Sequence, residues 1–110
     1  MVDVRKASLV SNPHGVKTSR IYDHENAQVI YMEMQPGQSL KKHITPVDVF
    51  FYILEGKVVV EIGDESQEAA VDTLVESPAG IPHRLMNEAG TNARLLVVKA
   101  PRQAEATRVL

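Results

Sequence analysis

Short segments with the hydrophobic pattern of β-strands, separated by turn-forming residues, run through most of this chain. In the segment 27–35 alternate residues share a face, which is the period of a strand. Pro36 and Gly37 then end this strand, since both residues favour turns. One of its faces carries Ile30, Met32 and Met34, and the other carries Val29, Tyr31, Glu33 and Gln35.

The segment 49–54 differs from the others because it is apolar at almost every position. A strand with this composition is normally covered on both faces. We therefore expect one face to line the interior of a barrel. The opposite face, with Phe50, Tyr52 and Leu54, requires a second sheet or a second subunit, and in so short a chain it predicts a homodimer.

The rest of the chain divides into further short strands at glycine, proline and polar turn residues. Regular spacing, glycines in the turns and no convincing helical pattern favour an all-β sandwich or barrel. The segment 102–110 is either a short docked strand or a frayed tail. The other predicted strands are 4–10, 16–22, 58–62, 67–71, 74–77, 84–87 and 93–99.

A length of 110 residues suits one domain with one core. We expect a single domain over 1–110, with 1–15 as an N-terminal strand or arm and 102–110 as a C-terminal tail. No apolar run reaches the roughly 20 residues that span a bilayer, and the N-terminus lacks a signal-peptide pattern. These features predict a cytoplasmic protein with no membrane partner.

Composition limits the chemistry that is available to the chain. With no cysteine, any metal must be held by nitrogen and oxygen ligands. The net charge of −2 is spread along the chain without a basic cluster, which argues against a nucleic-acid partner. No nucleophile elbow or glycine-rich phosphate loop is present, so nucleophilic hydrolysis and nucleotide binding find no support.

The stretch from Gly37 to Gly56 resembles the first motif of the cupin family. That motif reads G, five residues, H-x-H, three or four residues, E, six residues, G. His43 and both glycines stand at the family's spacing, with no insertion between them. Two positions depart from the motif, because Thr45 replaces the second histidine and Val49 replaces the glutamate.

The stretch 78–87 matches P-x-G-x-x-H-x-x-x-N, the body of the second cupin motif, at every fixed position, and its histidine is His83. Only the leading glycine is missing, since Asp72 occupies its place. The resemblance implies a cupin jelly-roll β-barrel, also called a double-stranded β-helix, of six to eight strands. Function must be argued separately, because this fold carries many unrelated activities.

In metal-binding cupins the first-motif ligands and the second-motif histidine converge inside the barrel, so the resemblance implies His43 and His83 as candidate metal ligands. A histidine pair binds divalent transition metals such as Zn, Ni, Mn, Fe or Cu, but structural zinc takes four protein ligands and catalytic zinc typically three. Two alternatives stay open. The pair holds a divalent metal, or the barrel is metal-free and its histidines bond each other, water or a ligand.

We expect a ligand pocket beside the pair. Tyr31 and Glu33 join it only if their face of the strand points inward, and the periodicity leaves that orientation open. Asp48 precedes the glutamate position by one residue, so alternation turns its carboxylate away and predicts a strand-entry or loop hydrogen bond, unless Pro46 bends the chain and brings Asp48 to the site. The expected pocket residues are Tyr31, Glu33, Thr45, Val49 and Phe51.

Other polar residues are weaker candidates. His14 lies in a Pro-Gly turn and reaches the site only if the N-terminal arm folds over the barrel mouth. His24 lies in a polar turn, where a histidine needs no special role. Lys41 and Lys42, if they lie at the mouth, would favour carboxylate or phosphate substrates.

These features predict a small-molecule cupin that binds a polar metabolite, a sugar or another oxygenated compound, beside His43 and His83. If the protein is an enzyme, the resemblance implies isomerase or oxygenase-like chemistry, with either histidine as metal ligand or general base. The alternative is a metal-free, non-catalytic module that binds or senses a ligand.

Overall fold

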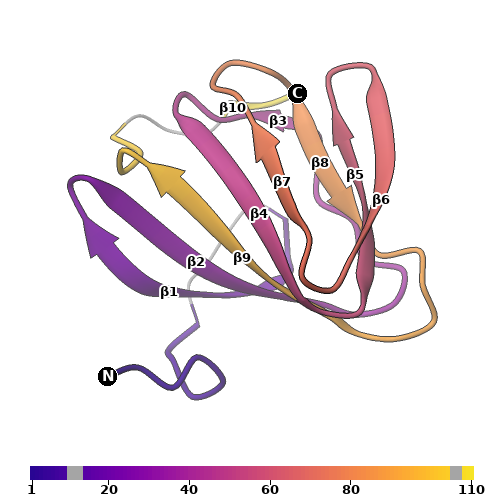
Figure 1. Ribbon diagram of the computed structural model, residues 1–110, viewed down its shortest axis with the longest axis horizontal. Helices are drawn as coiled ribbons and strands as arrows, with labels where there is room; N and C mark the ends of the chain where they lie inside the picture. Colours follow the sequence, from indigo (N-terminus) through magenta and orange to yellow (C-terminus); the bar gives the residue numbers. More distant parts are fainter. Residues whose placement is uncertain (10–13, 105–107) are drawn as a thin grey trace.

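A computed structural model of the chain describes residues 1–9, 14–104 and 108–110. Ten strands and no helix form in these ranges, so no helix in the described part is long and apolar enough to cross a membrane (Figure 1). The strands are β1 (Lys17–His24), β2 (Ala27–Met34), β3 (His43–Ile44), β4 (Asp48–Glu55), β5 (Lys57–Ile62), β6 (Glu65–Ala70), β7 (Leu74–Ser77), β8 (His83–Met86), β9 (Ala93–Ala100) and β10 (Arg108–Val109).

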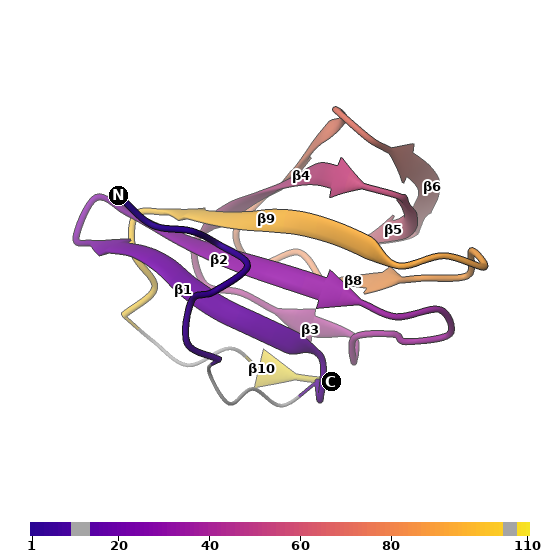
Figure 2. The same cartoon turned by 90° about the horizontal axis from the view of Figure 1, so that it is seen from below.

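The strands form two antiparallel five-stranded sheets that curve around a common interior (Figures 1 and 2). The first sheet has the order β1-β2-β9-β4-β7, and the second has the order β10-β3-β8-β5-β6. The all-β architecture expected from the sequence is confirmed. The resemblance implied six to eight strands, and the described residues form ten, of which β3 and β10 are two residues each.

Strand β4 shows how alternation builds the core. Its inward residues are Val49, Phe51 and Ile53, each at most 5% exposed. The intervening residues, beginning with Phe50, are half-buried on the outer face. Burial of a large apolar side chain contributes about 1.5–3 kcal/mol, so this face is a main source of stability. The same apolar cluster includes Met32, Met34, Val58, Val60, Leu85 and Leu95.

Two motif residues have structural roles. Asn87 is fully buried, and its side-chain amide donates hydrogen bonds to the carbonyl oxygens of Met34 (2.9 Å) and Thr91 (3.0 Å). It thereby ties the end of β8 to the end of β2, on the other sheet. Gly56 has a φ of 74°, and a Cβ there would lie 2.5 Å from the carbonyl oxygen of Asn92. Glycine therefore suits both the backbone conformation and the space in this turn.

The N-terminal segment is less regular than expected. The strand predicted for 4–10 is reduced to a single bridge between Leu9 and Ser19, and residues 10–13 lie outside the described residues. A turn forms early in the segment because the Asp3 carboxylate accepts the Arg5 amide at 3.0 Å. The segment crosses the outer face of the first sheet (Figure 2).

The C-terminal tail contains a docked strand. In β10, Arg108 pairs with Ile44 and Val109 pairs with His43, so this short strand covers the edge of β3. The Leu110 amide adds a hydrogen bond to the Lys42 carbonyl oxygen at 2.9 Å. Residues 105–107 lie outside the described residues.

The outer face of the first sheet keeps apolar side chains in contact with solvent. Tyr52 pairs with Leu96 on β9 and with Leu74 on β7. Phe50 pairs with Val98 in the neighbouring row. Leu74 is 49% exposed and the other four are half-buried. A contiguous apolar surface of this kind is typical of an interaction site.

We expect two copies of the chain to pair through this outer face. A Phe50→Arg substitution places a charge in the centre of the contact and should weaken the dimer more than about tenfold. Analytical ultracentrifugation at micromolar concentrations would measure the change. Ile81→Arg is the matched control, because Ile81 is 38% exposed and lies just before β8, in the second sheet. A monomeric unsubstituted protein would contradict the prediction.

Candidate functional site

His43 and His83 lie side by side on neighbouring strands of the second sheet. His43 on β3 pairs directly with His83 on β8. Both side chains are buried, at 7% and 2% exposure for the whole residues. Their Nε2 atoms are 2.9 Å apart, and their rings meet edge to face with centroids 4.4 Å apart. The ring of Phe51, from the opposite sheet, also meets His83 edge to face. The pair therefore lies in the barrel interior.

The hydrogen-bond partners of the two Nδ1 atoms determine which ring nitrogens of His43 and His83 carry a proton. His43 Nδ1 is 2.7 Å from the Lys41 carbonyl oxygen, which can only accept, so neutral His43 carries its proton on Nδ1. Its Nε2 then accepts, and His83 Nε2–H donates to it. His83 Nδ1 must accept in turn, and the Ser77 hydroxyl donates to it over 2.6 Å. A directed chain of hydrogen bonds runs from Ser77 through both imidazoles to the Lys41 carbonyl.

Burial favours the neutral form of both imidazoles. Desolvation is the main cause that lowers the pKa of His83 to about 4, and the neighbouring His43 and the Lys99 ammonium act in the same direction. Desolvation also lowers the pKa of His43, although the hydrogen bond to the Lys41 carbonyl opposes the shift. At neutral pH the pair therefore offers one N–H donor and one nitrogen acceptor that face each other.

Three of the expected pocket residues surround the pair. Thr45 Oγ1 is 3.3 Å from His83 Nε2, and Phe51 contacts the His83 ring with centroids 5.4 Å apart. Val49 is buried and pairs with Ser77, whose hydroxyl contacts His83. Ser77 was not expected at the site. The signal for it is the alternation in the predicted strand 74–77, which puts Ser77 in phase with the partly buried Val75.

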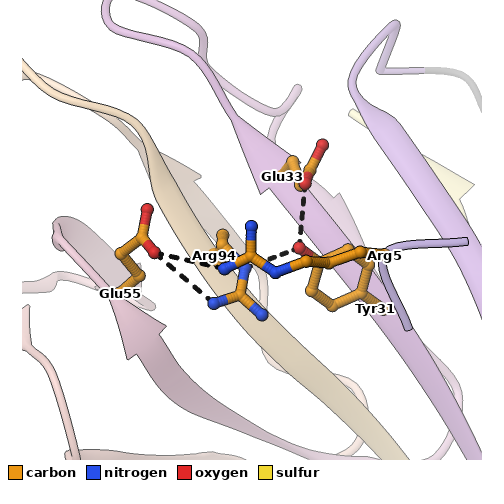
Figure 3. Close-up of polar contacts among 5 residues, drawn as sticks. All are labelled: Arg5, Tyr31, Glu33, Glu55 and Arg94. Atoms are coloured by element: carbon orange, nitrogen blue, oxygen red, sulfur yellow. Dashed lines mark hydrogen bonds and ion pairs between the residues drawn. The ribbon is translucent and has the colours of Figure 1, made fainter. Parts of the chain in front are cut away.

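The structure does not bring Tyr31 and Glu33 to the histidine pair. They share the outer face of β2, because Met32 and Met34 occupy the inner face. The Tyr31 hydroxyl donates to Glu33 Oε1 at 2.9 Å and accepts from Arg94 Nε at 2.7 Å (Figure 3). These two residues therefore belong to a polar cluster on the outside of the barrel.

The same polar cluster anchors the N-terminal segment. Arg94 and Arg5 both reach the Glu55 carboxylate, at 3.4 Å and 3.7 Å (Figure 3). The Arg5 and Glu55 side chains are largely exposed, so each ion pair contributes no more than about 1 kcal/mol. These ion pairs and hydrogen bonds explain why the side chains of the cluster lie together, and the explanation requires no ligand.

The remaining candidates divide between the site and the surface. Asp48 is exposed, and its Oδ1 accepts the Ala79 amide at 2.8 Å, the kind of loop hydrogen bond that alternation predicted. Lys42 pairs with Glu61 at 3.5 Å, away from the histidines. His24 is exposed.

His14 lies next to the pair. Its ring is tilted against that of His43, with centroids 4.6 Å apart, and its Nδ1 accepts the Lys41 amide at 3.1 Å. Burial is the main cause that lowers its pKa to about 4, followed by the effects of His43 and Lys41. Three imidazoles therefore meet at the end of the barrel where β3 lies.

Lys99 is a site residue that the sequence analysis missed. On β9 it continues the inner row that contains Val97, and it pairs with Gln28 on β2 and Val49 on β4. Its ammonium lies near enough to the pair to help lower the pKa of His43. The signal was present in the alternation of the strand predicted at 93–99, since Lys99 is in phase with Val97.

The pair provides half of a cupin ligand set for a metal. Two nitrogens that each bind one ion at about 2.1 Å can lie 2.9 Å apart, so the pair itself fits a shared ion. Thr45 and Val49 occupy the other two ligand positions. In the ranges 1–9, 14–104 and 108–110, no group of three or more His, Cys, Asp or Glu side chains is placed to hold an ion. A metal here would need water or a bound ligand to complete its coordination.

Comparison with known proteins identifies the class. The family model of the Cupin domain matches residues 30–99, so the chain belongs to the cupin family, as the two motifs predicted. The crystal structure of TT1209 from Thermus thermophilus is 33% identical, with a TM-score of 0.79 over 92% of this chain and 96% of that chain.

Two relatives are associated with polyketides. The polyketide cyclase RemF from Streptomyces resistomycificus has a TM-score of 0.85 over 100% of this chain and 84% of its own, at 20% identity, a likeness of fold. The tetracenomycin polyketide synthase protein TcmJ from Streptomyces glaucescens is 29% identical over 72 residues, which are 64% of this chain. The match spans 48% of TcmJ. These comparisons support a small-molecule cupin and specify neither substrate nor metal.

We expect the buried His83 to make the metal-free protein less stable in acid. Its folded-state pKa of about 4 lies below the ordinary 6.5, so the unfolded chain takes up a proton first as the pH falls. Stability should therefore decrease from pH 6.5 towards 4. Between about pH 7 and 4.5, a His83→Gln protein should lose about 2 kcal/mol less unfolding free energy than the unsubstituted protein.

Urea unfolding in EDTA at a series of pH values would measure this difference. His24→Gln, which removes an exposed imidazole, is the matched control. Equal pH slopes for the His83→Gln and unsubstituted proteins would show that His83 is not held neutral.

Proposed function

We propose that this cupin binds a small oxygenated metabolite inside the barrel, against His43 and His83. The observation that supports this proposal is the hydrogen-bonded chain from Ser77 through the two imidazoles, set among buried apolar side chains. Buried polar groups cost stability unless they are bonded, and apolar residues of similar volume often stabilise a core as well or better. A ligand that forms hydrogen bonds with these side chains would explain why polar residues occupy this part of the interior.

The pair suits proton transfer on that ligand. A ligand hydroxyl that separates the two rings would replace their direct 2.9 Å bond, accepting from the His83 N–H and donating to His43 Nε2. A base and an acid held this close can remove a proton at one atom and deliver a proton to another, as keto–enol isomerisation requires. The likeness to RemF and TcmJ supports a carbonyl-bearing compound as the ligand. The alternative is a binding or sensing module in which the same contacts hold a ligand that is not changed.

We expect metal-free protein to be stabilised by compounds of this class. A ligand at about 100 times its dissociation constant adds about 2.7 kcal/mol, which raises the melting temperature by several degrees. A thermal-shift screen of sugars, sugar acids and hydroxylated or keto-aromatic compounds in EDTA would find such ligands. The stabilisation should disappear in His83→Ala and persist in His24→Ala.

Proton NMR of each ligand in D₂O then separates the two functions. Deuterium incorporation or a new isomer that requires His43 and His83 supports catalysis, whereas binding without change supports the sensing module. Stabilisation that persists in both His43→Ala and His83→Ala would place the ligand elsewhere and contradict the proposal.

A specific feature favours a metal as a second candidate at the same pair. The two Nε2 atoms converge, and each Nδ1 already has an outer partner, an arrangement typical of metal-binding histidines. His83 needs only to move its proton to Nδ1 and donate to Ser77 Oγ for both Nε2 lone pairs to become free. A divalent ion held there would act as a Lewis acid on a ligand carbonyl.

We expect the double substitution Thr45→His and Val49→Glu to raise Ni²⁺ or Zn²⁺ affinity by about 100-fold or more, because both side chains are buried beside the pair. Val49→Glu alone places a carboxylate beside Lys99, which pairs with position 49 across the strands, so the metal-free protein should lose less stability than a buried carboxylate without a cation would cost. Isothermal titration would measure affinity, with His43→Ala in the double-substituted background as the control. A double variant that binds no tighter than the unsubstituted protein would show that positions 45 and 49 do not share the space of the pair.

A further inference from the structure

Lys99 places a cation on the inner face of the first sheet, opposite the imidazoles of the second. It stands between the buried Gln28 on β2 and the buried Val49 on β4. Its charge is among the causes that lower the pKa of His14, His43 and His83, as expected for an ammonium in their neighbourhood. Val49 pairs on its other side with Ser77, whose hydroxyl contacts His83, so one row of neighbouring inner residues links the cation to the histidine pair.

No carboxylate in the described ranges of the chain forms an ion pair with Lys99. Its ammonium donates instead to the neutral Gln103 Oε1 at 2.7 Å. A partly buried cation normally has a charged partner, because removal from water costs free energy that a neutral amide only partly offsets. Burial accordingly lowers the pKa of Lys99, and the neighbouring Arg20 guanidinium adds to the effect.

Asp23, the carboxylate in the cross-strand row that contains Gln28 and Lys99, already has charged partners. Asp23 pairs across the strands with Gln28, which separates it from Lys99. It lies 3.5 Å from Arg102 and 3.9 Å from Arg20, and it accepts the Gln28 side-chain amide at 3.5 Å. Two cations therefore share this carboxylate, and the surroundings of Lys99 stay positive.

We propose that the barrel takes an anion, whose carboxylate or enolate oxygen pairs with Lys99 while another oxygen of the same molecule meets the His43–His83 pair. This inference rests on the proposed function and adds the charge of the ligand. A bound anion would supply the charged partner that Lys99 does not find among residues 1–9, 14–104 and 108–110, and it would accept charge-assisted hydrogen bonds, which are stronger than neutral ones. Lys99 acts here as a binding residue that selects acids over their neutral analogues.

The test compares each acid with a neutral counterpart of similar shape. Salicylate is paired with salicylamide and gluconate with glucose, and inorganic phosphate tests for a site that takes any anion. Binding is measured by isothermal titration and thermal shift in EDTA at constant ionic strength, so that neither a metal nor bulk screening contributes. The proteins are unsubstituted, Lys99→Met, Lys99→Arg and His83→Ala. Lys57→Met is the matched control, because Lys57 is exposed on β5 and pairs with Glu68.

We expect at least one carboxylate to bind the unsubstituted protein at least about tenfold more tightly than its neutral counterpart. Lys99→Met, which keeps the length of the side chain, should remove that preference. Lys99→Arg should retain most of it, and Lys57→Met should leave it unchanged. Phosphate that binds as tightly as the carboxylates would overturn the selection of an organic acid.

The outcomes separate this inference from the proposed function. Binding that requires His83 but is indifferent to Lys99 and to ligand charge overturns the inference and leaves the proposed function standing. Binding that requires neither residue overturns both. If no carboxylate stabilises the unsubstituted protein at millimolar concentration, the inference is overturned, because a partly buried ammonium that is available to a ligand should attract an acid of this size.

Discussion

The pairing of β9 with both β2 and β4 determines where every inner side chain of the first sheet lies. Leu95 stands between Met32 and Ile53, and further along the same face of the strand Lys99 stands between Gln28 and Val49. The rows therefore change from apolar to polar along the barrel, and the polar end is the end that faces the imidazoles. A slip of one residue would reverse every side chain, so the large apolar interface holds the polar residues in place.

The two imidazoles also constrain each other through their protons. Facing Nε2 atoms at 2.9 Å require one proton between them, because two lone pairs or two N–H groups would repel. The Lys41 carbonyl settles which ring donates, and Ser77 completes the arrangement. Thr45 and Val49 stand where the family motif has a histidine and a glutamate, so His43 and His83 are the motif ligands that remain, and each of their ring nitrogens has a hydrogen-bond partner.

Sequence reasoning located the histidine pair and three residues around it because the two motifs contain no insertion and strand alternation carries the register between them. It could not place Tyr31 and Glu33, since a period of two shows which residues share a face and leaves open which face is inside. Lys99 was overlooked because charged residues are rarely buried, an expectation that outweighed its phase with Val97. The two-residue strand β3 has no period at all, so only its pairing partners reveal it.

The docking of β10 has a further consequence for the strand that carries His43. Without Arg108 and Val109, β3 would be the edge of the second sheet, with its free backbone groups beside His43. An open edge invites pairing with a strand of another molecule, and that contact would form directly beside His43. The short tail strand thus protects the site from other copies of the chain, and proteolytic trimming near residue 108 would leave a protein that is prone to self-association.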